Sequence, residues 1–484
     1  MRIRHAMLLA AVLAVLAGCN NGSWSSGDRV LVSKVLYETG IQQPRRFDVV
    51  VFKYPVEPLK KGVPTNYIKR LLGLPGQILA IFFGQLFFFD PSEEGEPAPF
   101  NDLADPNIDQ KDLWHREYMH IDHDNTRQMF EAGKFKMVRK PPAVMMALRR
   151  IVYDNNYQAS DLGREFKRWA PAANSSWTAS DDFRDFNHAG AKGDNIDWLR
   201  YKNLIPPGDR PEPLKIAGPK QLITDFESYN QFNLLQGHHE KPDANWVGDL
   251  MLECNVQVEK AEGFFYMELS RGINRFRARF DLEKGQCTLL KQGPKEAKEG
   301  KWEELASKET SVKRPGTYML RFANFDARLT VWVDRQLPFG DGHDYPPPEV
   351  RDPNNKQDAK LTWDELRERC GPRKNDLEPA SLGSQGAQVQ IHNLRLWRDT
   401  YYTLRAEGPD AVLGPNDWAE PKDWGPLRKL DFKTMYVQPG HYLCLGDNSP
   451  ASSDSRSWGL VPQRLMLGRA LLVYYPFDRA GPIR

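Results

Sequence analysis

The chain has 484 residues, of which 40% are hydrophobic, 11% aromatic and 27% charged, so its length predicts two to four domains and excludes a single small module. The 36 Gly and 36 Pro predict many turns in a globular protein, and the composition argues against wholesale disorder and against a multi-span membrane protein. Lys and Arg total 66 against 64 Asp and Glu, and this net charge of +2 argues against a nucleic-acid partner.

The N-terminus predicts export and attachment to a membrane. Basic residues precede the apolar stretch 6–17, which as a helix would rise only ~18 Å against a hydrocarbon core of ~30 Å, so it is typical of a signal peptide. The Leu-Ala-Gly-Cys sequence that ends at Cys19 resembles the lipobox of bacterial lipoproteins, which implies that Cys19 carries lipid. The alternatives are cleavage by the general secretory route and an uncleaved short anchor. We therefore expect a lipoprotein on the extracytoplasmic, periplasmic face of a bacterial membrane.

Four cysteines lie beyond Cys19, and their spacing does not predict a metal site. None forms the CxxC pair that zinc sites use, although export permits disulfides and four cysteines allow three pairings. We expect buried free thiols or one structural bridge at these positions, which are Cys254, Cys287, Cys370 and Cys444.

Residues 27–90 predict a compact unit of short strands joined by turns. Its four apolar segments are 29–32, 47–52, 67–72 and 78–89, the last broken at Gly84-Gln85. The phenylalanines between 82 and 89 form either the buried core of a hairpin or an apolar surface that touches lipid. The core interpretation is favoured.

The middle of the chain predicts a connector followed by a β-sandwich. Residues 91–152 are acidic and irregular apart from one expected helix at 143–152, after Pro141-Pro142. Residues 153–402 contain strands with alternating apolar and polar positions, such as the half-buried strand expected at 250–258, separated by Gly and Asn turns. By pattern rather than by motif, this region resembles the jelly rolls of concanavalin-type lectins and laminin-G-like domains.

Four ordered blocks near the two ends of the chain resemble the type I signal peptidase family. They are GDRVLVSKVLY (27–37), RRFDVVVFKYP (45–55), NYIKRLLGLPGQIL (66–79) and GDNSPASSDSRSWGLVPQRLMLGRA (446–470). The resemblance implies a membrane-associated antiparallel β domain that cleaves exported preproteins after small side chains. It implies a serine nucleophile, a lysine general base and no cofactor.

The expected organisation is mainly β, with a signal-peptidase-like antiparallel β domain split by a long inserted jelly-roll β-sandwich. The expected segments are a signal peptide with lipobox (1–19), the first part of the β domain (20–90), the connector (91–152), the sandwich (153–402) and the second part of the β domain (403–484).

The resemblance also assigns roles to residues at the two ends. Lys69 falls where the family places its base, which must be neutral, so its pKa would have to fall from about 10.4 to about 7 or 8 through burial. Ser452 matches the serine that orients this lysine, and Arg70 is expected to be a structural cation. The residues that match the charged supports of the family site are Asp447, Asp454 and Arg456.

Two departures from the family pattern stand out. Positions 449–451 read Ser-Pro-Ala where many members have Arg-Asp-Asn, which predicts a thinner ion-pair network. The nucleophile motif Ser-Met-x-Pro-Thr, which the family places about eight residues before the Gly-Asp at Gly27, is missing. Three interpretations follow. Ser23 is the nucleophile through a shortened loop, Cys19 is the nucleophile as an unlipidated thiol, or the protein keeps the scaffold without hydrolysis.

Other chemistries are less well supported by the sequence. The His-carboxylate cluster between His115 and Asp124 fits no familiar metal spacing, so a solvated loop and no metal are expected. The sandwich lacks the carboxylate pairing of a jelly-roll glycosidase. Its tryptophans are expected in the core rather than on a sugar, and they include Trp246, Trp332 and Trp397. The expected partners are a membrane, exported preproteins or peptides, and a glycan; the alternative function is a catalytically inactive envelope lipoprotein that binds peptide or glycan.

Overall fold

The computed structural model describes most of the chain from residue 28 onward. The described residues are 28–38, 42–55, 65–93, 95, 124–158, 166–190, 193, 195–204, 219–226, 245–351, 355, 358–405, 410 and 418–484. Cys19, Ser23 and the histidines of the expected His-carboxylate cluster lie outside these ranges. Within these ranges, no helix has the length and apolar character that crossing a membrane requires.

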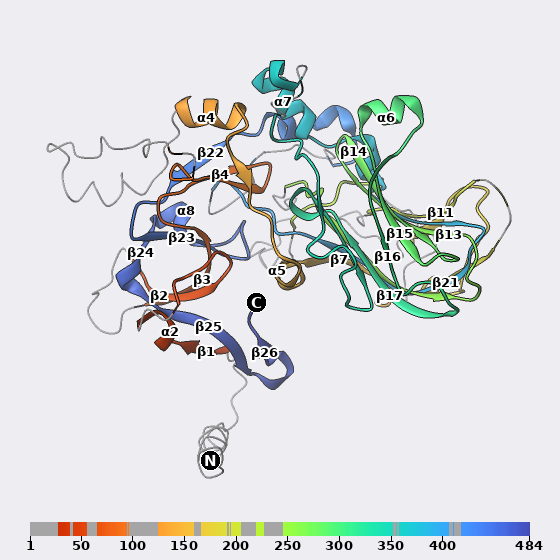
Figure 1. Cartoon of the computed structure of the whole chain (residues 1–484), viewed down its shortest axis with the longest axis horizontal. Helices are drawn as coiled ribbons and strands as arrows, with labels where there is room; N and C mark the ends of the chain where they lie inside the picture. Colours follow the sequence, from red (N-terminus) through yellow and green to blue (C-terminus); the bar gives the residue numbers. More distant parts are fainter. Residues whose placement is uncertain are drawn as a thin grey trace, which may run out of the picture.

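Both ends of the chain build one antiparallel sheet (Figure 1). Its strand order is β1-β25-β2-β3-β23-β24, with β26 paired to β25. The strands are β1 (Arg29–Ser33), β2 (Val49–Lys53), β3 (Asn66–Gly73), β23 (His441–Leu445), β24 (Val461–Pro462), β25 (Met466–Tyr475) and β26 (Gly481–Pro482). Two short helices belong to this unit, α2 (Val35–Glu38) and α8 (Ser455–Trp458). Because β25 lies between β1 and β2, the red and blue ends of the chain form a single unit.

A four-stranded sheet buries the phenylalanine run. This sheet shares an apolar cluster with the sheet that both ends of the chain build, and the two sheets together are called the terminal unit. Its strands, in spatial order, are β22 (Lys433–Tyr436), β4 (Ile78–Phe82), β5 (Gln85–Phe89) and β6 (Lys136–Met137). Phe82, Phe87 and Phe89 are at most 2% exposed, and the first two pack against Phe130 of α4 (Asp124–Glu131). The core interpretation of this run is therefore confirmed.

Two larger antiparallel sheets form a β-sandwich, much of it green in Figure 1. The eight-stranded sheet consists of β19 (His343–Asp344), β18 (Arg328–Val333), β17 (Gly316–Ala323), β12 (Leu250–Val258), β21 (Gln388–Arg398), β10 (Phe186–Ala189) and β9 (Trp177–Ala179), with β7 (Arg150–Asp154) also paired to β21. The seven-stranded sheet consists of β16 (Glu303–Glu309), β15 (Gln286–Gln292), β14 (Asn274–Asp281), β13 (Phe264–Arg271), β20 (Ala380–Gln385), β11 (Asp197–Tyr201) and β8 (Trp169–Pro171). Apolar side chains of both sheets share one core, for example Val256 from the first and Phe265 from the second. The fold is thus mainly β and antiparallel, as expected.

Strand β12 is more buried than its alternating sequence predicts. Val256 faces the main core as expected, but Met251 and Glu253 on the opposite face are only 0% and 4% exposed. Helix α5 (Pro142–Leu148) covers this face, where its Met145 packs with Met251 in a separate apolar cluster. The expected half-buried strand is therefore wrong for the first half of β12, because a helix from the connector supplies a second apolar partner.

The connector is also more structured than expected. The helix predicted at 143–152 ends at Leu148, because Arg149 adopts an extended conformation (φ −58°, ψ 141°) and the chain continues as β7. Helix α4 and strand β6 were not predicted at all. The remaining described α-helices are α6 (Pro294–Glu299) and α7 (Trp363–Cys370).

A buried cluster of charges joins the connector to the sandwich. The ammonium of Lys140 lies 2.5 Å from Oδ1 of Asp326 and 2.8 Å from Oδ2 of Asp399, and these three side chains are at most 5% exposed. With Asp249, the two aspartates form a carboxylate group with the spacing of a metal site, but an ammonium already lies between two of its members. Gln85 of β5 donates to Asp249 at 3.1 Å, so the cluster also contacts the terminal unit.

The four cysteines are free thiols rather than a disulfide, and the three tryptophans pack in or against apolar clusters. Cys254, Cys287, Cys370 and Cys444 are buried free thiols. Burial raises the pKa of each thiol, which disfavours the reactive thiolate. Trp246, Trp332 and Trp397 all pack in or against apolar clusters.

Candidate active site

Strand β3 places Lys69 beside an apolar face of the terminal sheet. Lys69 pairs with Val50 on β2, and alternation puts it on the same face as Leu71. Leu71 pairs in turn with Cys444 on β23, and Val50, Leu71 and Cys444 are 0% exposed. Lys69 is itself partly buried, so its side chain lies at the border between the core and solvent.

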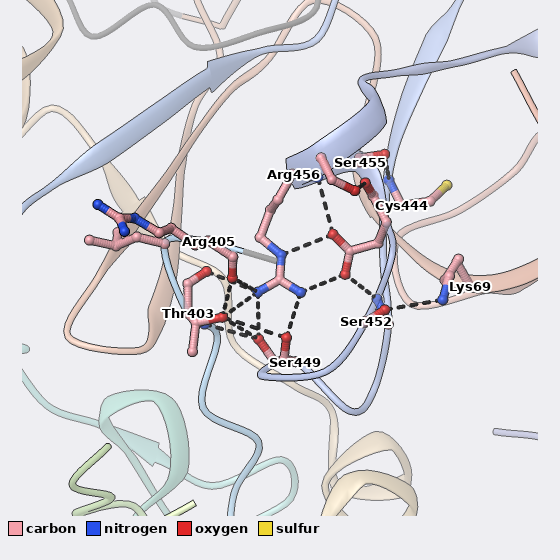
Figure 2. Close-up of polar contacts among 12 residues, drawn as sticks. Lys69, Thr403, Arg405, Cys444, Ser449, Ser452, Ser455 and Arg456 are labelled. Carbon is pink, nitrogen blue, oxygen red and sulfur yellow. Dashed lines mark hydrogen bonds and ion pairs between the residues drawn. The ribbon is translucent and has the colours of Figure 1, made fainter. Parts of the chain in front are cut away.

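The amine of Lys69 lies within hydrogen-bond distance of a serine hydroxyl. Nζ of Lys69 donates to Oγ of Ser452 at 3.1 Å, as Figure 2 shows. Burial lowers the pKa of Lys69, and the positive charge of Arg456 lowers it further, whereas Asp454 opposes this shift. Ser452 is 5% exposed. A lysine that releases its proton readily and contacts a fixed hydroxyl has the properties of a general base.

Gly446 leaves room for this pair. A Cβ atom at position 446 would lie 2.0 Å from Oγ of Ser452 and 3.5 Å from Nζ of Lys69, so any larger residue would collide with the serine. The N–H of Gly446 donates to Oδ2 of Asp454 at 3.0 Å, and Oδ1 of Asp454 accepts from the N–H of Arg456 at the start of α8. The carboxylate of Asp454 thus links the two ends of the 446–456 loop, and the contact with Ser452 requires glycine at position 446.

The guanidinium of Arg456 is the centre of a buried hydrogen-bond network (Figure 2). It is 3% exposed and donates to the two carboxylate oxygens of Asp454 at 2.9 and 2.6 Å. Its other N–H groups donate to neutral oxygens of Ser449, Thr403 and Arg405. Ser449 accepts through both its hydroxyl and its carbonyl, each at 2.8 Å. Positions 449–451 carry no charged side chain, and the acceptors that Arg456 finds there are the two neutral oxygens of Ser449.

A second ion pair fixes the start of the same loop to β3. Nε and Nη2 of Arg70 donate to the two carboxylate oxygens of Asp447, both at 2.8 Å, and Nη1 donates to the carbonyl of Phe47 at 3.0 Å. Arg70 is 3% exposed and Asp447 is 35% exposed. This bidentate geometry is that of a structural cation, the role expected for Arg70.

The structure brings together most, but not all, of the residues singled out in the sequence. Those in contact around the 446–456 loop are Lys69, Ser452, Asp454 and Arg456, with Arg70 and Asp447 as a neighbouring pair. The two candidate nucleophiles, Ser23 and Cys19, lie outside the described residues. Sequence reasoning missed Thr403 and Arg405, which precede the 446–470 block by more than forty positions and carry no local signal.

Comparison with known proteins supports the signal peptidase family for the two terminal segments. The family model described as "Signal peptidase, peptidase S26" matches residues 4–122 and 386–475. Signal peptidase I of Buchnera aphidicola is 41% identical over 46 residues, which cover 10% of this chain and 15% of that protein. Mitochondrial inner membrane protease subunit 1 of Xenopus tropicalis is 45% identical over 49 residues, which cover 10% of this chain and 29% of that protein. The chain thus spans less than a third of the length of these relatives.

Among solved structures, the chain is similar to the carbohydrate binding module CBM66 from Bacillus subtilis. The TM-score is 0.26 at 11% identity, and the match covers 47% of this chain and 94% of that one.

Proposed function

We propose that the protein is a signal-peptidase-like serine endopeptidase, bound to a membrane on its extracytoplasmic side, that cleaves the signal peptides of exported preproteins. The observation that carries this proposal is the 3.1 Å contact between Lys69 and Ser452. A lysine on a strand is usually a solvated residue, whereas this amine is partly buried and its pKa is lowered. The family match of the terminal segments supports the same proposal.

In the proposed mechanism, Lys69 transfers protons while Ser452 orients its amine. The neutral amine takes the proton of the nucleophilic hydroxyl as that oxygen bonds to the carbonyl carbon of the scissile peptide. The C–N bond breaks, the leaving amine takes the proton from Lys69, and water hydrolyses the ester through the same base. Ser23 is the proposed nucleophile, and an unlipidated Cys19 is the alternative.

Exposed apolar side chains around β25 support contact with a membrane. Leu31 of β1, Val35 of α2 and Leu471 of β25 are 52%, 60% and 38% exposed. Phe477, in the 3-10 turn η10 (Phe477–Arg479), is 65% exposed. Helix α2 and η10 both contact β25, and β1 pairs with it, so each of these side chains lies on or beside β25. Exposed apolar side chains of this kind favour a lipid surface, to which lipid on Cys19 would hold the protein.

A cleavage assay tests the proposed function. The purified full chain is incubated with a preprotein that carries an Ala-x-Ala site, beside the Lys69→Ala variant. Cleavage by the wild type that is lost in the variant supports the peptidase, whereas equal inertness of both rejects it. Ser23→Ala and Cys19→Ser variants then identify the nucleophile, and the intact mass of membrane-extracted protein reports lipid on Cys19.

Gly446→Ala should lower cleavage about tenfold to a hundredfold, because the new methyl group displaces Ser452 from Lys69. The measurement is kcat/KM on the same preprotein, together with the melting temperature. Gly425→Ala is the matched control, since Gly425 has helical angles (φ −50°, ψ −46°) and no atom lies within 4 Å of its added Cβ. Equal activity of the two variants would contradict the role given to the space at 446.

The alternative function is an inactive envelope lipoprotein that binds peptide or glycan, and one observation favours its glycan-binding part. A cavity of about 270 Å³ opens on the eight-stranded sheet at β9, β10 and β21. Its hydrogen-bonding lining consists of Thr178, Ser180, Asp185, Asn187, Gln390 and His392. Hydroxyl, amide and imidazole groups of this kind suit a neutral glycan, which presents many hydroxyl groups.

Calorimetric titration with a panel of neutral oligosaccharides tests the glycan alternative. We expect binding that is weakened at least tenfold, or about 1.4 kcal/mol, by Gln390→Ala. Gln292→Ala, which lies on the other sheet and donates to the carbonyl of Lys301 at 2.9 Å, should bind as the wild type does. Absence of binding across the panel would remove the glycan from consideration. A peptide as ligand of the terminal unit is tested by the same titration with the uncleaved signal peptide.

A further inference from the structure

The chain leaves the sandwich through a segment that is buried as far as Thr403 and runs past the candidate active site. This exit segment, residues 399–405, follows strand β21. The N–H of Tyr402 donates to the carbonyl of Gly84 in the β4–β5 turn at 3.1 Å. The N–H of Thr403 donates to Oγ of Ser449 at 2.9 Å. Successive residues of the exit segment are therefore fixed to the terminal unit.

Thr403 offers two acceptors to the guanidinium of Arg456. Nη1 of Arg456 lies 2.6 Å from Oγ1 and 3.0 Å from the carbonyl oxygen of Thr403, and Thr403 is 0% exposed. The hydroxyl of Thr403 in turn donates to the carbonyl of Arg405 at 2.5 Å, which fixes its lone pairs toward Arg456. Because the guanidinium is almost fully buried, its position depends on protein acceptors rather than on water.

The contacts continue from Arg456 to the lysine. Arg456 holds the carboxylate of Asp454, and that carboxylate accepts the N–H of Gly446. Gly446 lies directly against Ser452, whose hydroxyl accepts from Lys69. A displacement of Arg456 would therefore move the loop that presents Ser452.

We propose that Thr403 is a positioning residue of the candidate active site, which fixes Arg456 and, through Asp454, the contact between Ser452 and Lys69. The sandwich is then more than an attached module, since the segment by which the chain leaves it supplies part of the support of the site. The inference rests on the proposed function only for the role of Lys69 as a base.

The charged groups that face Lys69 determine whether its pKa rises or falls when Arg456 is displaced. Burial lowers the pKa of Lys69 most, and Arg456 lowers it as well, whereas Asp454, Asp447 and the thiol of Cys444 raise it. The carboxylate of Asp454 is also held by the N–H groups of Gly446 and Arg456. Displacement of the Arg456 guanidinium away from this carboxylate, or entry of water into the loop, therefore raises the pKa of Lys69.

The test measures the pH dependence with which Lys69 of the full chain reacts with acetic anhydride, read by mass spectrometry, because this needs no turnover. Thr403→Val should move the midpoint upward by about half to one pH unit. Thr403→Ser keeps the hydroxyl and should restore the wild-type midpoint. Thr330→Val is the matched control, since Thr330 is also 0% exposed and donates to the carbonyl of Asp341 at 3.0 Å within the sandwich. Its midpoint should equal that of the wild type.

Ser449→Ala keeps the inference testable if Thr403→Val does not fold. It removes the other hydroxyl that accepts from Nη1 of Arg456, at 2.8 Å, and should also move the midpoint upward. An unchanged midpoint in either folded variant, or an equal shift in Thr330→Val, would overturn the inference. A wild-type midpoint near the ordinary lysine value of about 10.4 would instead reject Lys69 as the base. The positioning role of Thr403 is tested only by the difference in the Lys69 midpoint between the wild type and the Thr403→Val or Ser449→Ala variant.

Discussion

The Lys69→Ala variant should cleave a preprotein about a thousandfold more slowly than the wild type, because removal of a general base that also activates the nucleophile costs about 10²–10⁴ in rate. The side chain lies at the border of the core, so the fold should survive its truncation. The measurement is kcat/KM beside the melting temperature. Lys53→Ala is the control, since Lys53 lies on the adjacent strand β2, opposite Asn66, and should leave cleavage unchanged.

The pH dependence of the wild-type reaction follows from the same residue. A base acts in its neutral form, so kcat/KM should rise with pH through the pKa of Lys69. Burial lowers that pKa below the ordinary lysine value, so the ascending limb should lie below about pH 10.4. Residual cleavage by Lys69→Ala with the wild-type pH profile would show that another group is the base.

Lys140→Met should destabilise the protein by about 3–5 kcal/mol, because it removes the cation from a buried cluster of carboxylates. Asp326 and Asp399, its two partners, are 2% and 1% exposed. Urea unfolding monitored by tryptophan fluorescence measures the free energy. Lys136→Met is the matched control, because the pair of Lys136 with Glu93 is 54% exposed on each side and contributes less than about 1 kcal/mol.

The effect of Lys140→Met should depend on pH in a defined direction. Burial raises the pKa of Asp399 to about 7 and also raises that of Asp249. A carboxyl group whose pKa is raised by folding binds its proton in the native state, so stability falls as pH rises from about 4 toward that pKa. Removal of the ammonium raises the pKa of Asp399 further, because Lys140 lowers it in the wild type. The destabilisation by Lys140→Met should therefore be smaller at pH 5 than at pH 8, and a pH-independent loss would contradict this account of the cluster.

The strands of the terminal unit could be predicted because local patterns determine them. The segments 29–32, 67–72 and 78–89 became β1, β3 and the β4–β5 hairpin, since apolar alternation and turn residues act over a few positions. The proximity of Lys69 and Ser452, which are 383 positions apart, was expected from the family blocks rather than from any periodicity.

What the sequence did not predict depends on contacts between distant segments. Thr403 carries no motif, and its two acceptor atoms matter only because the exit segment passes Arg456. Lys140 reads as an ordinary surface lysine beside two prolines, yet folding places it between two aspartates from the sandwich. The burial of Met251 likewise arises from α5, a helix more than one hundred positions earlier in the chain.

The two places where the chain enters and leaves the sandwich are neighbours. Arg150 of β7 and Arg398 of β21 are directly opposite each other in the antiparallel ladder. Meanwhile β4 and β22, which flank the intervening chain, remain paired, with Leu79 opposite Met435. When the two ends of an inserted domain lie side by side, the domain can be inserted at one surface position without separating the strands around it. The sandwich can therefore be carried as an insertion while β4 and β22 keep their pairing in one sheet.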